Sequence, residues 1–292
     1  MKALGIDIGG TKIYAAIVDK NGVIISEIKK YATPKTKLEI ENTLKEIIST
    51  FENEIDVIGI STAGAISNDN TKVLGSTGNL CKDYPSIDFM GLSNKKVVLE
   101  NDANCAAWAE YKLGAGNGKQ NIIVLTLGTG VGGGIIVNGQ LLKGKNGAAG
   151  EMHFKMSRNK RRPCTCGSYD CFEAYASGTG LKLTAQEVSQ NPAMTTYDVI
   201  DGVNTGDELC KKILNIWQND IADGAIGIAN IFDPDYIILS GSMAQFVDYQ
   251  KINEIVNKEI VTTPTQIVPA KFSNNAGLIG AGILAMSKCV IE

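Results

Sequence analysis

Asp7-Ile8-Gly9-Gly10-Thr11-Lys12 decides the fold, because a loop of similar design returns later in the chain as Leu127-Gly128-Thr129-Gly130-Val131-Gly132-Gly133-Gly134. Each loop joins two apolar runs that read as strands, at residues 3–8 and 13–18 and again at 122–127 and 135–137. Glycine permits positive φ and leaves room for a ligand, so successive N–H groups can point at one anion. One such loop reads equally well as an ordinary β-turn. Two copies with matching flanks predict two halves that bind one polyphosphate, and hence a nucleotide.

The composition is that of an ordinary globular chain, long enough for two domains or one large one. It has 292 residues, of which 44% are hydrophobic and 20% charged, with a net charge of −3 and a pI near 5.4. No basic patch stands out, so no nucleic-acid partner is expected, and no run approaches the roughly 20 apolar residues of a membrane span. Seven cysteines, an odd number, without a signal-peptide pattern indicate a reducing cytoplasm.

Hydrophobic periodicity predicts strands and helices that alternate in both halves, and therefore an α/β fold. The predicted strands span residues 2–8, 12–19, 23–30, 56–61, 96–100, 121–127, 134–138 and 236–240, with a hairpin turn at Lys20-Asn21-Gly22. A first helix follows the capping box Thr36-Lys37-Leu38-Glu39 and buries Ile40, Leu44, Ile47, Ile48 and Phe51. Further helices are expected at 103–113, 207–232 and 276–289; in the second of these, Leu209, Ile213, Trp217 and Ile221 are in register.

Asn101 and Asp102 stand where the predicted strand 96–100 meets the next helix. Asn and Asp are favoured at helix N-caps, which is one interpretation of the pair. Ligands of open α/β sheets also bind at the carboxyl ends of strands, where a carboxylate can accept a proton from a substrate hydroxyl. Asp102 is therefore a candidate general base, and both interpretations stay open.

The single histidine and a cluster of cysteines indicate a metal site. His153 is followed by Cys164, Cys166 and Cys171 in a polar, irregular segment that covers 143–172. One imidazole and three thiolates complete the tetrahedral ligand set of zinc, and four protein ligands leave no open position. The alternative is four unrelated residues, because a free Cys is usually a small core residue. The clustering favours a structural zinc.

Three further segments are weaker candidates. Glu151 and Glu173 bracket the cysteines, and carboxylates fixed by a metal loop can hold sugar hydroxyls, although most Glu residues are simply exposed. Ser240-Gly241-Ser242 ends a predicted strand and either leaves room for an adenine ring or forms a plain turn. Small residues at 275–282 likewise either leave room for the nucleotide or only permit close helix packing.

Together these residues resemble the ROK family of bacterial sugar kinases, within the larger actin–hexokinase–Hsp70 group, over nearly the whole chain. The resemblance assigns nucleotide binding to Asp7, Gly9, Gly10, Thr11, Lys12, Gly128, Thr129, Gly130, Gly132, Gly133 and Gly241. It assigns sugar binding to Gly64, Asn79, Asn101, Asp102, Glu151, His153 and Glu173, catalysis to Asp102, and zinc to His153, Cys164, Cys166 and Cys171. The chain departs from the family pattern at Asp170, where Gly is expected, and at an adenosine segment that is not all glycine.

The resemblance also implies the fold and the reaction. The fold is a two-lobed actin/hexokinase-like (ribonuclease H-like) α/β fold, with duplicated mixed-sheet domains and a nucleotide cleft between them. Residues 1–115 form a smaller lobe, on which the helix at about 276–292 packs back, and residues 116–275 form a larger lobe. The reaction is phosphoryl transfer from ATP to the 6-hydroxyl of a hexose or N-acylhexosamine, with Mg²⁺ on the phosphates near Asp7 and a structural Zn²⁺. A cytoplasmic homodimer without nucleic-acid or membrane partners is expected.

Within the family, Ser61-Thr62-Ala63-Gly64 bears on the sugar. Glucokinase-like members typically carry Pro in place of Ala63, and this version, with Ala106-Ala107-Trp108-Ala109-Glu110, looks more like the N-acetylmannosamine kinases of sialic acid catabolism. The Thr62 hydroxyl is expected to hydrogen-bond the acetamido group. A glucokinase or N-acetylglucosamine kinase is the nearer alternative. A sugar-responsive transcriptional repressor is disfavoured, because such relatives carry a helix-turn-helix domain before the phosphate loop, which here starts at residue 7. A protein-folding ATPase is disfavoured because that function would leave the cysteine segment unexplained.

Overall fold

The computed structural model describes residues 1–75, 79–156 and 162–289. Their contacts group them into two compact units. The first contains residues 1–118, 134–150 and the chain from 274 onward, and the second contains residues 119–133 and 151–273. Compact units defined by contacts are not necessarily lobes that move as bodies, so the expected lobe boundary at 115/116 stays a prediction.

The first sheet has the strand order β3-β2-β1-β4-β5. Strands β1, β4 and β5 are parallel to one another, whereas β2 is antiparallel to both β1 and β3. Asp7 pairs with Ser61 and Thr62 with Asn101 at the carboxyl ends of the parallel strands. This edge therefore gathers the candidate residues of the unit. The strands are β1 Lys2–Ile8, β2 Lys12–Asp19, β3 Lys29–Ala32, β4 Val57–Thr62 and β5 Val97–Asn101.

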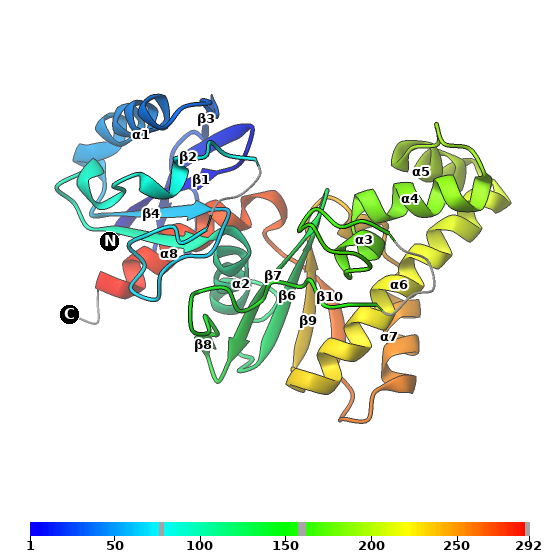
Figure 1. The fold of residues 1–292 in the computed structure, drawn as a ribbon. Helices are drawn as coiled ribbons and strands as arrows, with labels where there is room; N and C mark the ends of the chain where they lie inside the picture. Colours follow the sequence, from blue (N-terminus) through cyan, green and yellow to red (C-terminus); the bar gives the residue numbers. More distant parts are fainter. Residues whose placement is uncertain (76–78, 157–161, 290–292) are drawn as a thin grey trace. The chain divides into compact units, whose positions relative to one another are not determined.

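Helices cover both faces of the first sheet (Figure 1). Helix α1, Lys37–Phe51, begins after the Thr36 cap and buries the five apolar residues expected from its periodicity. Helix α8, Ala276–Cys289, packs on β1, β4 and α2, Asp102–Leu113. A Cβ on Gly59 would overlap the backbone of Ala281, and one on Gly280 that of Cys105. The small residues of α8 thus permit close backbone packing.

The second sheet has the strand order β10-β9-β6-β7-β8, with β6, β9 and β10 parallel. Asn138 and Gly139 both have positive φ, 49° and 75°, as in the tight turns that join hairpins such as β7–β8. Two mixed five-stranded sheets with flanking helices form the duplicated actin/hexokinase-like fold. The strands are β6 Ile122–Leu127, β7 Val131–Val137, β8 Gln140–Leu141, β9 Tyr236–Ser240 and β10 Gln266–Pro269.

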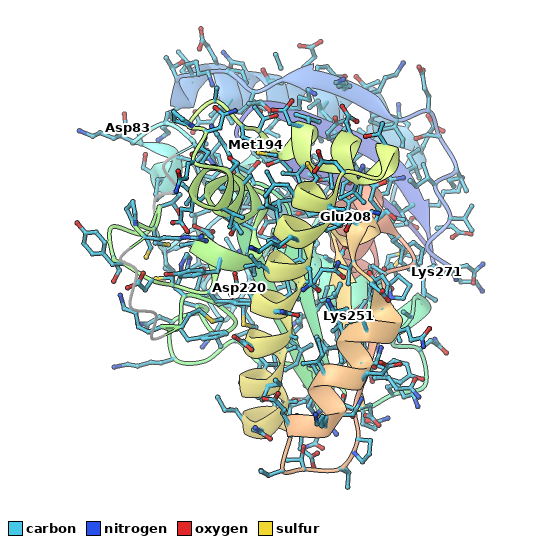
Figure 2. The ribbon with its side chains drawn as sticks, turned by 90° about the vertical axis from the view of Figure 1, so that its right-hand side faces the viewer. Asp83, Met194, Glu208, Asp220, Lys251 and Lys271 are labelled. Carbon is cyan, nitrogen blue, oxygen red and sulfur yellow. The ribbon has the colours of Figure 1, made fainter. Side chains whose placement is uncertain are left out.

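The long helix α6, Glu208–Phe232, organises the helices of the second unit. It packs against α3, α4, α5 and α7, and Figure 2 shows α6, marked by Glu208 and Asp220, beside α7, marked by Lys251. Trp217 is fully buried and donates its indole N–H to the carbonyls of Ala176 and Ser177. The other helices are α3 Glu173–Ala176, α4 Gly178–Ser189, α5 Thr196–Thr205 and α7 Tyr249–Glu259. No helix among the described residues is both long and apolar enough to cross a membrane.

Three sequence expectations for the elements were wrong. The strand expected at 23–30 is reduced to Lys29–Ala32, because the Ser26 hydroxyl instead of a backbone carbonyl accepts the Ile17 N–H. Leu209 is 42% exposed, and the buried face of α6 begins instead at the neighbouring Cys210. Gly132 and Gly133 belong to β7 instead of the preceding loop. Helices α3, α4, α5 and α7 and the edge strands β8 and β10 were not predicted.

Candidate active site

The first glycine loop is a tight turn between β1 and β2. Gly9 N–H donates to the carbonyl of Lys12 (2.9 Å), and Thr33 Oγ1 donates to the carbonyl of Gly9 (2.7 Å). Thr11 and Lys12 are exposed. A Cβ on Gly10 would lie 2.6 Å from the Cβ of Asn79. Glycine at this position therefore brings Asn79, an expected sugar residue, against the expected phosphate loop.

Asp7 lies at the end of β1 and shares its surroundings with Ser61 on β4. Ser61 Oγ donates to Asp7 Oδ1 at 2.6 Å, and a Cβ on Gly277 of α8 would lie 3.0 Å from both oxygens. Burial raises the pKa of Asp7, and the hydrogen bond from Ser61 opposes that shift. A nearby cation favours the ionised form of such a carboxylate, so the position suits a hydrated Mg²⁺.

The N-cap of α2 is Asn101, and Asp102 is the first helical residue. Asn101 Oδ1 accepts the N–H groups of Ala103 (3.0 Å) and Asn104 (3.1 Å), and its Nδ2 donates to the carbonyl of Gly64 (3.1 Å). An amide offers two acceptor sites and two hydrogens, so these three bonds leave one hydrogen of Asn101 Nδ2 over, and the expected sugar contact stays a prediction. Asp102 is exposed and accepts the Ala103 N–H. Asn101 is therefore the N-cap, Asp102 shares the Ala103 N–H with it, and the general-base interpretation of Asp102 stays a prediction.

Thr62 does not have the role expected from the sequence. Its side chain is fully buried, and its Oγ1 lies 2.6 Å from the hydroxyl of Tyr84, which is also fully buried. Alternation along β4 turns Thr62 toward the hydrophobic core and Ser61 toward Asp7. The Thr62 hydroxyl is thus occupied by Tyr84 and is not presented to an acetamido group.

The second glycine loop is fixed to α4 and to Glu173. Gly178 N–H donates to the carbonyl of Gly128 (2.8 Å), and Thr179 Oγ1 donates to that of Thr129 (2.8 Å). Glu173 Oε2 accepts the N–H of Val131 at 3.1 Å. A Cβ on Gly130 would overlap Glu173 Oε2, so this glycine makes room for a protein carboxylate. One side chain thereby connects the loop with the cysteine segment.

A cavity of about 470 Å³ adjoins this loop within the second unit. Gly241 has a φ of +87° and lets the end of β9 approach Leu127 of β6. Helix α5 supplies a wall that the sequence analysis missed, although the capping box Thr195-Thr196-Tyr197-Asp198 marks the start of this helix. The volume and the contact with the glycine loop suit a nucleoside beside its phosphates. The lining includes Gly128, Thr129, Lys182, Tyr197, Ser242 and Phe246.

The four expected zinc ligands lie together in the second unit. One ligand atom from each of His153, Cys164, Cys166 and Cys171 falls within 4.8 Å of the other three. The sulfurs of Cys166 and Cys171 are 3.7 Å apart, close to the edge of about 3.8 Å that zinc–sulfur bonds of about 2.3 Å give a tetrahedron. Burial raises the pKa of Cys164 to about 12, a preference for the thiol that a bound cation would reverse. The donor set therefore fits zinc.

His153 offers its two ring nitrogens to different partners. Its Nδ1 lies 3.5 Å from the sulfur of Cys164, whereas its Nε2 lies 3.7 Å from a carboxylate oxygen of Glu151. A metal held by Nδ1 leaves Nε2 on the side of Glu151, so the expected metal and sugar roles of His153 are compatible.

Asp170, which departs from the family pattern, adopts the conformation that glycine would supply. Its φ is +55°, and its buried carboxylate accepts the Arg162 N–H (2.7 Å) and the Tyr175 hydroxyl (2.8 Å). The Arg162 side chain pairs with Glu187 of α4 at 2.7 Å. The sequence analysis missed this network, which fastens the cysteine segment to α3 and α4.

The described residues thus provide a phosphate-type turn with a half-buried Asp, an Asn–Asp pair at a helix start, and a zinc-type cluster beside two glutamates. The sequence model of the ROK family matches residues 3–288. The chain belongs to the ROK family. Its enzyme class is accordingly that of the ATP-dependent sugar kinases.

Relatives with different sugar names are equally similar to this ROK protein. A glucokinase of Streptomyces coelicolor is 32% identical over 316 residues, covering 97% of this chain and 96% of the relative. An N-acetylmannosamine kinase of Yersinia pseudotuberculosis is 32% identical over 291 residues, covering 97% and 98%. The crystal structure of a ROK family glucokinase from Streptomyces griseus with glucose and AMPPNP has a TM-score of 0.80 at 29% identity, covering 98% and 100%. Similarity alone does not choose the sugar.

Proposed function

We propose that the protein transfers the γ-phosphoryl group of ATP to the 6-hydroxyl of N-acetylmannosamine. Glucose and N-acetylglucosamine are the alternative acceptors within the same family. The choice of N-acetylmannosamine over glucose rests on Ala63. Glucokinase-like members of the family typically carry Pro at this position, whereas the version with Ala63 looks more like the N-acetylmannosamine kinases. Ala63 is partly exposed between buried Thr62 and Gly64, whose carbonyl accepts a hydrogen bond from Asn101. A change at this residue therefore alters the loop beside the Asn–Asp pair.

Asp102 is proposed to accept the proton of the attacking hydroxyl, and Asn101 to donate its remaining hydrogen to a sugar oxygen. General-base assistance contributes roughly 10²–10⁴ in rate, and phosphoryl transfer otherwise depends on positioning and charge. Mg²⁺ would supply charge neutralisation at the phosphates. Asp7 is proposed to hold its water shell, and the two glycine loops with Thr11, Lys12 and Thr129 to hold the phosphates.

In the second unit, Glu151, Glu173 and Nε2 of His153 are proposed to bind sugar hydroxyls, while the zinc cluster fixes their geometry. The 470 Å³ cavity is proposed to take the nucleoside. We further propose a cytoplasmic homodimer, which sedimentation of the purified protein would test.

A sugar panel with ATP and Mg²⁺ tests the substrate, with kcat/KM for N-acetylmannosamine, N-acetylglucosamine and glucose measured under one set of conditions. The highest value is expected for N-acetylmannosamine, and a clear preference for glucose contradicts the proposal.

Asp102→Asn tests the base. Because Asn101 is the cap, the fold and ATP binding should persist while turnover falls by roughly 10²–10⁴. A loss of less than about tenfold contradicts general-base assistance of that size.

A further inference from the structure

Glu100 is buried next to the turn that carries Asn101 and Asp102, at the end of β5. Its side chain is 1% exposed, and its Oε2 lies 2.9 Å from Nζ of Lys143, which is itself 15% exposed. Lys143 also donates to the carbonyl of Ser67 at 2.9 Å. Neither Glu100 nor Lys143 is among the proposed sugar- or phosphate-binding residues, so their pairing needs a separate explanation.

Every partner of the Glu100 carboxylate is a hydrogen-bond donor. Oε1 accepts the backbone N–H of Asn101 (2.9 Å) and Nδ2 of Asn104 (3.1 Å). Oε2 accepts Nζ of Lys143 and Nδ2 of Asn70 (2.8 Å). An ionised carboxylate has about four acceptor sites, so these four donors account for all of them. Glu100 is therefore saturated by protein groups and is not itself a substrate ligand.

We infer that Glu100 is a positioning residue for phosphoryl transfer, with Lys143 as its counter-ion. Oε1 holds the backbone before Asp102 through Asn101 and the first turn after it through Asn104, so one oxygen fixes both sides of the base. A displacement of about 1 Å at a catalytic group can cost about 100-fold in rate. The inference rests on the proposed role of Asp102.

The nearly isosteric change Glu100→Gln is a sensitive test of the carboxylate, because an amide group cannot accept hydrogen bonds from all four surrounding donors. In either orientation its NH₂ group faces donors. Asn104 can turn its amide, since its Oδ1 has no hydrogen-bond partner among the described residues. The Asn101 N–H cannot reverse, and Asn70 Nδ2 is also held by the carbonyl of Leu99 at 2.8 Å. The substitution therefore leaves the Asn101 N–H opposed in one orientation, and Lys143 Nζ and Asn70 Nδ2 opposed in the other.

The experiment compares Glu100→Gln, Lys143→Met and Lys143→Arg with Glu110→Gln as the matched control. Glu110 is fully buried near the other end of α2, where it accepts the Ala115 N–H at 2.8 Å. Positioning predicts that Glu100→Gln lowers kcat by about tenfold or more and raises the sugar KM, while the ATP KM changes by less than about twofold. Lys143→Met should show the same split, and Lys143→Arg should restore most of kcat. Glu110→Gln should lower the melting temperature without this split.

Two results with folded variants at Glu100 and Glu110 overturn the inference. One is wild-type kcat in folded Glu100→Gln while Asp102→Asn is inactive, which leaves the proposed function standing. The other is the same kinetic split in Glu110→Gln, which reduces Glu100 to a contribution to stability. Should Glu100→Gln fail to fold, equal kcat in Lys143→Met and Lys143→Arg also overturns it. Full activity in Asp102→Asn instead removes the proposed base on which the inference rests, while the proposed phosphoryl transfer itself still stands.

Discussion

Replacing Thr62 by Val tests whether the end of β4 contributes a hydroxyl to the sugar or to the core. Val has nearly the shape of Thr and replaces only the hydroxyl, by a methyl group. Thr62 Oγ1 and the Tyr84 hydroxyl are 2.6 Å apart, and both side chains are fully buried. The substitution therefore leaves the Tyr84 hydroxyl buried without this partner.

The structure sets the size of the effect. A buried polar group that loses its partner costs about 1–3 kcal/mol, and the added methyl group returns up to about 0.8 kcal/mol. Thr62→Val should therefore lower the free energy of unfolding by about 0.2–2 kcal/mol. Replacing both residues, with Tyr84→Phe as the second change, removes the pair together and should cost less than the sum of the single changes.

Urea unfolding of the wild type, both single variants and the double variant measures this coupling. Sugar kinetics on the same four proteins measure any role at the active site. The order of preference among N-acetylmannosamine, N-acetylglucosamine and glucose should be unchanged in Thr62→Val. A changed order, or strictly additive unfolding free energies, would refute the reasoning.

Two further predictions concern the second unit. Gly130→Ala should raise the sugar KM with a loss of stability below about 1 kcal/mol, because the new Cβ displaces only the flexible end of Glu173. In Gly128→Ala the new Cβ would meet nothing within 4 Å, and this variant should raise the ATP KM instead. The reverse pattern in steady-state kinetics would count against the roles given to these two glycines. Cys166→Ser should lower the zinc content, the melting temperature and the sugar affinity together. The control Cys81→Ser, outside the cluster, should retain zinc. A metal analysis that finds no zinc in wild-type protein prepared without chelator refutes the zinc site.

Elements with a strong local signal were predicted well from the sequence. The buried face of α1 follows from a helical period, and β1 and β2 follow from apolar runs around a glycine turn. Helix α7 was missed because it buries only Ile252 and Val256, which is too few for periodicity to stand out. The strand expected at 23–30 failed because the Ser26 hydroxyl replaces a backbone acceptor for the Ile17 N–H, and no hydrophobic pattern reveals that contact.

The sequence allowed a group of candidate site residues to be chosen by residue type, but it did not reveal the hydrogen-bond and ion-pair partners of several side chains. The four ligand residues at 153–171 could be grouped because zinc demands a specific donor set. The role of Thr62 could not be inferred, because its partner Tyr84 lies in a segment without a recognisable pattern. The role of Lys143 was also missed, because its pairing with Glu100 depends on the tertiary fold and not on a local pattern.

Asp170→Gly restores the residue expected from the family pattern. It compares the backbone strain at this position with the stabilisation from the hydrogen bonds that the Asp170 carboxylate accepts. Glycine removes the strain of a non-glycine residue at φ +55°, worth about 1 kcal/mol. It also removes the acceptor of the Arg162 N–H and the Tyr175 hydroxyl, and hydrogen bonds to a charged group contribute about 1.5–3 kcal/mol each. The variant should therefore unfold more easily by about 2–5 kcal/mol and release zinc to a chelator sooner, with Asp170→Asn intermediate because Asn tolerates this φ. Urea unfolding with and without chelator measures both effects. If Asp170→Gly proves more stable than the wild type, the carboxylate network does not compensate for the strain, and the proposed fastening of the cysteine segment is wrong.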